Sequence, residues 1–125
     1  MADTSPVQDI DLSFLNEIAD GNKEFVDESI EMFVAQTPGM LDTIKAGILE
    51  KNWQIAAAAA HKLKPNLGFF GMTTSEELSR NIELMAKSNA PEAEQLILKF
   101  NELSDIVEKN LILLTRMREN KQIEL

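Results

Sequence analysis

Hydrophobic residues recur every three or four positions along most of the chain, and this spacing places them on one face of an α-helix. One long run lies between Lys23 and Lys51, with apolar positions at Val26, Ile30, Phe33, Leu41, Ile44 and Ile48. Pro38 and Gly39 interrupt this run without shifting its phase, so we expect a single long helix with a kink. A second long run, from Glu92 to about Arg118, carries Leu96, Phe100, Leu103, Val107, Leu111, Leu114 and Met117.

Two shorter patterns flank these long runs. Leu12, Leu15 and Ile18 predict a short helix over residues 11–19, with Asp9 or Asp11 as its N-cap. The segment 74–77, Thr-Ser-Glu-Glu, is typical of a capping box and predicts a helix that continues to about Lys87. The inward positions of this second helix are Leu78, Ile82 and Met85.

The central helix is predicted from Asn52, its capping residue, to about Phe70. Its apolar face contains Ala56, Ala59, Ala60, Leu63, Leu67 and Phe70. Its opposite face contains Gln54, Ala57, Ala58, His61, Lys64, Pro65 and Gly68. Long charged side chains usually cover an exposed helix face, whereas most of these residues are small. We therefore expect the imidazole of His61 to project from a low surface that another protein can approach closely.

No segment alternates as a β-strand does, and the connections between the helical runs are short. Short connections make consecutive helices antiparallel. We predict an all-α fold, an antiparallel up-down-up-down four-helix bundle with a short additional N-terminal helix. Residues 1–125 form one domain in this interpretation, with flexible ends at 1–8 and 119–125. The apolar stripes are all used within one bundle, so we expect a monomer.

Composition excludes several classes of protein. The chain has no cysteine, which removes disulfides, thiol nucleophiles and cysteine zinc sites. A formal charge of −9 argues against nucleic-acid binding, which depends on lysine and arginine contacts to phosphates. No segment is typical of a signal peptide or of a membrane span of about 20 apolar residues. We expect a cytoplasmic protein; the Met1 start suggests a free-standing one, although a fragment of a larger kinase would have the same sequence.

His61 is the only histidine, which limits the chemistry it can perform. One histidine cannot supply the paired Glu-x-x-His motifs of a di-metal bundle, and its helix face offers no serine for a catalytic triad. No glycine-rich phosphate loop is present, and the methionines are too scattered to indicate a haem site. An exposed lone histidine is most often an ordinary surface residue. The remaining functional interpretation is a nucleophile that accepts a phosphoryl group, with Lys64 one turn away to offset the new charge.

The segment Ala60-His61-Lys62-Leu63-Lys64, with Gly71 ten residues after the histidine, resembles the signature of histidine-containing phosphotransfer domains, the HPt family. The order of helices over nearly the whole chain is similar to that family as well. The resemblance implies that His61 is the phosphoacceptor and that Lys64 steadies the phosphoryl group. It also implies that Glu83 hydrogen-bonds the second ring nitrogen and that Gly71 lets the helix end and pack closely. The alternative for Glu83 is an ordinary exposed helix residue.

The chain departs from the family pattern directly after Lys64, where the family usually has glycine and this chain has Pro65. Proline has no N–H to offer the carbonyl of His61, so we expect strain or a bend in the helix below the ring. Gly68, one turn further along the same face, would restore the clearance that a docking partner needs.

The resemblance implies a phosphorelay carrier and not an enzyme. His61 would accept a phosphoryl group from the phospho-aspartate of a receiver domain in a hybrid histidine kinase and pass it to a response regulator. The chain itself needs no metal or cofactor, because Mg²⁺ is expected on the receiver. The predicted docking residues are Gln54, Ala57, Ala58, Lys62, Pro65 and Gly68. The alternatives are an adaptor that docks receivers without phosphotransfer, and an enzyme with His61 as general base, which requires a concave pocket.

Overall fold

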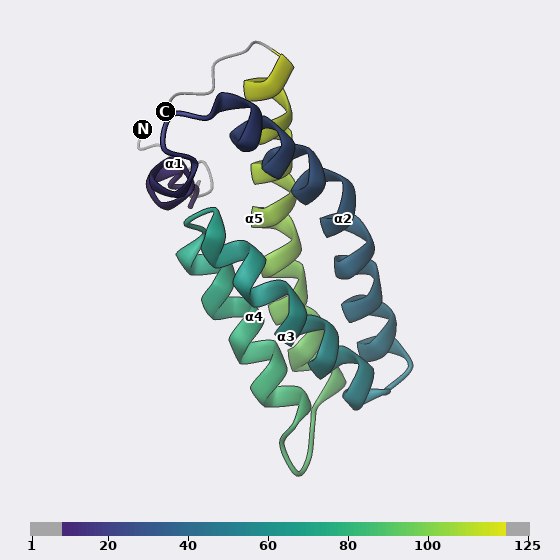
Figure 1. Ribbon diagram of the computed structural model, residues 1–125. Helices are drawn as coiled ribbons and strands as arrows, with labels where there is room; N and C mark the ends of the chain where they lie inside the picture. The colour runs from purple at the N-terminus through teal and green to yellow at the C-terminus, as the bar shows by residue number, and fades with distance from the viewer. Residues whose placement is uncertain (1–8, 120–125) are drawn as a thin grey trace, which may run out of the picture.

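The computed structural model describes residues 9–119, and they form five helices joined by short turns. The helices are α1 (Ser13–Ala19), α2 (Lys23–Leu49), α3 (Trp53–Phe69), α4 (Thr73–Ala86) and α5 (Ala93–Glu119). Helices α2 to α5 run alternately in opposite directions, α3 packs between α2 and α4, and α5 packs against the same two helices (Figure 1). Helix α1 lies across the end of the bundle where α2 begins (Figure 1). The predicted all-α bundle is confirmed, while the predicted flexible ends fall almost entirely outside the described residues.

The core consists of the apolar stripes that the sequence predicts. Every predicted inward residue of α2 and α3 is buried, and so are those of α5 up to Leu114. Met85 and Met117 are only partly buried at the edge of the core. Ile18 is a correction, because it is about half exposed while Leu15 and Ala19 make the buried contacts of α1. Between residues 9 and 119, no helix combines the length and the apolar character that a membrane crossing requires.

Two asparagine caps and two internal prolines define the central helices. Asn22 Oδ1 accepts the backbone N–H of Phe25 at 3.0 Å, and Asn52 Oδ1 accepts that of Ile55 at 3.3 Å. Both caps confirm the sequence interpretation. Helix α2 continues through Pro38, and α3 continues through Pro65 to Phe69.

The start of α4 differs from the predicted capping box. The helix begins at Thr73, and no side chain at its N-cap position makes a capping hydrogen bond. The cap comes instead from Asp9, whose Oδ2 accepts the N–H of Ser75 at 2.8 Å. Its Oδ1 accepts from Nδ2 of the buried Asn110 on α5 at 2.6 Å. Asp9 therefore joins the N-terminal segment to two helices, and it is not the cap of α1.

Gly71 ends α3 in a conformation that favours glycine. Its φ is +69°, and a Cβ at this position would lie 2.6 Å from Cβ of Asp11 and 2.8 Å from its backbone nitrogen. The N–H of Asp11 donates to the carbonyl of Phe70 at 3.0 Å, so the two backbones are in direct contact. Asp11 also accepts the N–H of Ser13 at 2.9 Å and so serves the start of α1. Gly71 thus allows α3 to pack closely against the segment before α1.

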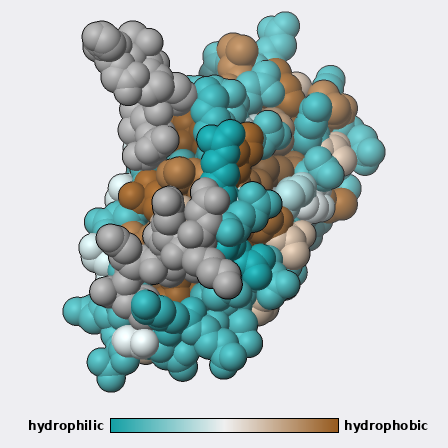
Figure 2. Space-filling model, turned by 90° about the horizontal axis from the view of Figure 1, so that it is seen from above, coloured by the Kyte–Doolittle hydropathy of each residue, from teal (hydrophilic) through white to brown (hydrophobic). Residues whose placement is uncertain are grey.

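Aromatic side chains fix α1 to the end of α3. The ring of Phe14 meets that of Phe69 edge-on, with 5.7 Å between centroids, and Phe69 meets Phe70 in the same way at 5.5 Å. Phe14 remains about half exposed, and hydrophobic surface is visible at this end of the bundle (Figure 2).

Candidate functional site

His61 lies in the middle of α3 with its imidazole on the surface. Its side chain is 66% exposed, and its Nδ1 lies 2.9 Å from Oε2 of Glu83 on α4. The register between the two helices is set one turn earlier, where Oγ of the buried Ser79 donates to the carbonyl of Ala60 at 2.9 Å. Because Glu83 follows Ser79 by one helical turn, its carboxylate reaches the level of the imidazole.

Glu83 is a buried carboxylate that holds three basic side chains. Besides the imidazole, Nζ of Lys64 lies 2.8 Å from Oε1, and Nζ of Lys87 lies 3.0 Å from Oε2. The pairing with Lys64 is the largest cause that lowers the pKa of Glu83 to about 2. Burial opposes this shift, and Lys87 and His61 lower the pKa further. The carboxylate is therefore ionised at neutral pH and can only accept hydrogen bonds.

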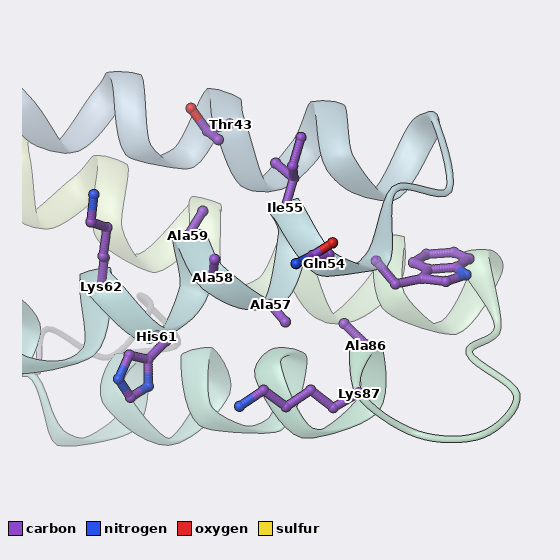
Figure 3. Close-up of a pocket in the computed structure, with 11 residues that line it drawn as sticks. Thr43, Gln54, Ile55, Ala57, Ala58, Ala59, His61, Lys62, Ala86 and Lys87 are labelled. Carbon is purple, nitrogen blue, oxygen red and sulfur yellow. The ribbon is translucent and has the colours of Figure 1, made fainter.

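This arrangement defines which ring nitrogen is free. An ionised carboxylate accepts from Nδ1 of His61, so Nδ1 carries a proton. In the neutral ring, Nε2 then holds a lone pair. The imidazole stands on the outer side of α3, away from the helix axis (Figure 3). The geometry suits a nucleophile that attacks a group presented from outside the protein.

The lowered pKa of Glu83 predicts a specific acid sensitivity. Between pH 4.5 and 2 the unfolded chain binds a proton at Glu83 that the folded chain does not, so stability falls as pH falls through this window. Solvent screens part of the pairing, so we expect a loss of roughly 1–3 kcal/mol. Urea unfolding of wild type and of Glu83→Gln measures it. The difference in unfolding free energy between the two proteins should shrink from pH 5 to pH 2.5, and a constant difference would contradict the pairing.

A hollow with a volume of about 780 Å³ lies beside the imidazole, between α3 and its neighbours (Figure 3). Its lining residues are Thr43, Trp53, Gln54, Ile55, Ala57, Ala58, Ala59, His61, Lys62, Ala86 and Lys87. Small and apolar side chains make up most of this lining, and its basic residues are His61, Lys62 and Lys87. The hollow offers a partner an apolar surface next to the reactive ring.

The structure places the predicted docking residues in different surroundings. Gln54, Ala58 and Lys62 are exposed in the lining of the hollow. Ala57 was predicted on the exposed face, but it is only 4% exposed. It is buried because α3 packs closely against α4 at this point, and Ala86 lies opposite it in the hollow (Figure 3).

The structure also gives the surroundings of three other predicted site residues, Pro65, Gly68 and Lys64. Pro65 is exposed on α3 but does not line the hollow. Gly68 is half-buried beside α4, where a Cβ would lie 3.0 Å from Oε2 of Glu76, and its role in clearing space for a partner stays a prediction. Lys64 is only 25% exposed, since its ammonium turns inward to Glu83.

Lys87 is a site residue that sequence reasoning missed. It follows Glu83 by four residues, the spacing at which acidic and basic side chains pair on a helix. That spacing was the available signal.

The alternative of an enzyme with a general base needs more than a hollow. Glu83 orients His61 but does not line the concavity, and the described residues that line it include no carboxylate and no serine. Between residues 9 and 119, no group of three or more histidine, cysteine, aspartate or glutamate side chains is arranged to hold a metal ion.

Comparison with known proteins finds one matching family model and a solved structure with a similar fold. A family model described as the Hpt domain matches residues 28–116, a range that includes all of α3 and α4. A solved structure of the Hpt domain from an Hpt sensor hybrid histidine kinase of Shewanella has a TM-score of 0.75 and 19% sequence identity. The alignment covers 94% of this chain and 98% of that one, and at this identity the likeness establishes the fold alone. No curated protein matches the chain.

Proposed function

The chain belongs to the Hpt domain family, whose members carry phosphoryl groups in two-component signalling, and we propose that His61 is its phosphoacceptor. The donor is the phospho-aspartate of a receiver domain in a hybrid histidine kinase, and the acceptor is the aspartate of a response regulator. The observation that supports this proposal is the exposed imidazole whose Nδ1 is held by the ionised carboxylate of Glu83. The chain acts as a carrier and is not itself an enzyme.

The transfer requires little covalent chemistry from this chain. The lone pair on Nε2 of His61 attacks the phosphorus in line with the aspartyl oxygen, so a P–N bond forms as the P–O bond breaks. The aspartate leaves as a carboxylate, and the Nδ1 proton stays against Glu83 throughout. Glu83 therefore orients the ring and fixes its tautomer. Mg²⁺ bound to the receiver would stabilise charge on the phosphoryl oxygens.

The hollow beside His61 is the proposed docking surface. Its apolar floor includes Ala57 and Ala86, and Gln54 and Ala58 line it from α3. The basic side chains near the ring complement the acidic phosphoryl site that a receiver presents, which favours encounter in the productive orientation. In this role the chain works as a cytoplasmic monomer between two protein partners.

Transfer of a radioactive phosphoryl group tests the proposal. A receiver domain loaded with labelled phosphate is mixed with the wild-type chain and then chased with a second, unlabelled receiver. We expect the label to reach the chain in an acid-labile, alkali-stable form, as a phosphohistidine requires, and then to leave it for the second receiver. A receiver that lacks its phosphoacceptor aspartate is the control. Failure of every receiver of the source organism to label the chain would contradict the proposal.

The second candidate is an adaptor that uses the same hollow without phosphotransfer. Trp53 lines the hollow and is the only tryptophan in the chain, so its fluorescence reports docking directly. A receiver that changes this fluorescence but leaves no label on the chain would favour the adaptor.

A further inference from the structure

We propose that Lys87 is a second cation that contacts the phosphoryl group once His61 carries it. This inference rests on the proposed function and assigns a residue of α4 to the stabilisation of the phosphorylated state.

The shared carboxylate oxygen of Glu83 brings Lys87 to the imidazole. Nδ1 of His61 lies 2.9 Å from Oε2, and Nζ of Lys87 lies 3.0 Å from the same atom. Both side chains line the hollow, and Lys87 extends along α4 with its ammonium group toward the ring (Figure 3). A phosphoryl group on Nε2 is therefore within the range that a long, flexible lysine side chain can sweep.

Lys87 is freer to turn toward the phosphoryl group than Lys64 is. The side chain of Lys64 is 25% exposed and pairs with Oε1, so its departure would leave that oxygen of a buried carboxylate without its cation. The side chain of Lys87 is 61% exposed, so its ammonium group can turn into solvent without being buried unpaired. When Lys87 turns away, Oε2 still accepts the hydrogen bond from the imidazole.

The charge at the site also calls for a second cation. Glu83 pairs with His61, Lys64 and Lys87, and Lys62 is the remaining charged residue that lines the hollow. A phosphoryl group adds about two negative charges beside the single charge of Glu83. Lys64 neutralises the carboxylate of Glu83. The negative charge of the phosphoryl group therefore needs another basic side chain. Lys62 points to the other side of α3 from His61 (Figure 3). Lys87 is therefore the lysine that we expect to contact the phosphoryl group.

Phosphoramidate, a small phosphoryl donor, allows a test without any receiver. Its P–N bond breaks, ammonia leaves, and a new P–N bond forms to Nε2 of His61. The ³¹P resonance of the loaded protein, followed against pH, then reports the second pKa of the phosphoryl group. A contacting ammonium favours the dianion, so Lys87→Ala should raise this pKa by about 0.5 unit, a threefold weaker preference for the dianion. Lys87→Arg should keep the wild-type value.

Lys62→Ala is the matched control, since it removes a neighbouring lysine that points elsewhere, and it should shift the phosphoryl pKa far less. Equal shifts in the two alanine variants would overturn the contact. Slower loading of Lys87→Ala with an unchanged phosphoryl pKa would also overturn it, because Lys87 would then only hold Glu83. A wild-type chain that takes no phosphoryl group from phosphoramidate would overturn both the acceptor and the contact. Loading by phosphoramidate but by no receiver would reject the relay while the Lys87 contact stands.

Discussion

Replacing His61 by glutamine should abolish acceptance of the phosphoryl group from a phosphorylated receiver, by a factor of about 10³ or more. The glutamine amide can still donate a hydrogen bond to Glu83, but its nitrogen has no lone pair available for attack on phosphorus. The imidazole is 66% exposed, so its loss removes little buried contact and the bundle should keep its thermal stability. The label-transfer assay measures the loss, and circular dichroism on heating measures the fold.

Two comparisons make the result of His61→Gln specific. Lys109→Gln changes an exposed residue of α5 that pairs with Asp105, and this variant should accept the label as the wild type does. The fluorescence of Trp53 should still respond to the receiver in His61→Gln, which separates lost chemistry from lost docking. Label retained by His61→Gln would place the acceptor on another residue and reject the site.

Replacing Gly71 by alanine should destabilise the bundle by about 2–5 kcal/mol. An alanine at φ +69° costs about 1–2 kcal/mol, because L-residues with a Cβ disfavour the left-handed region. The added Cβ also collides with the backbone of Asp11, which has no flexible side-chain end that could yield. Displacing the Asp11 segment would add a cost similar to that of an overpacked core. Urea unfolding at neutral pH measures the sum.

Two other glycines separate conformation from collision. Gly21 also has a positive φ, +86°, but nothing lies within 4 Å of its Cβ position, so Gly21→Ala should cost only about 1–2 kcal/mol. Gly39 lies inside α2 with open space around it, and Gly39→Ala should stabilise the helix by up to about 1 kcal/mol. If Gly71→Ala lowered the free energy of unfolding no more than Gly21→Ala does, the close approach of Asp11 would contribute nothing to the cost of the substitution.

The fold follows from local patterns, which is why the sequence predicts it well. The period of Val26, Ile30 and Phe33 depends on helix geometry alone, and Asn22 and Asn52 cap the helices that directly follow them. These signals need no knowledge of distant neighbours.

The features that sequence reasoning missed depend on residues far apart in the chain. Asp9 caps α4 across 66 residues, and no local pattern distinguishes it from a cap for α1. Ala57 is buried because α4 approaches it at Ala86. Alanine occurs on both buried and exposed faces of helices, so its identity does not predict burial. Ile18 is exposed because the buried positions of α1 are Leu15 and Ala19, and Ile18 lies outside that buried face. Each outcome is set by packing between elements.

The site shows the same division. His61 and Lys64 were found through a motif on one helix, and Glu83 through the resemblance to the family. The charge arrangement was not visible in the sequence, because it arises where α3 and α4 meet. Only the structure shows that Lys64 turns inward and that Lys87 shares an oxygen of Glu83 with the imidazole.

Asp9 has a practical consequence for anyone who moves this module into a synthetic signalling protein. The family match begins at residue 28, yet the chain before it supplies the cap of α4 and the buried Leu15. It also supplies Asp27, whose carboxylate accepts two hydrogen bonds from Arg118. A fusion joint at the family boundary would cut away these supports. The joint belongs upstream of Asp9, so that the transplanted piece keeps the supports that its N-terminal segment provides.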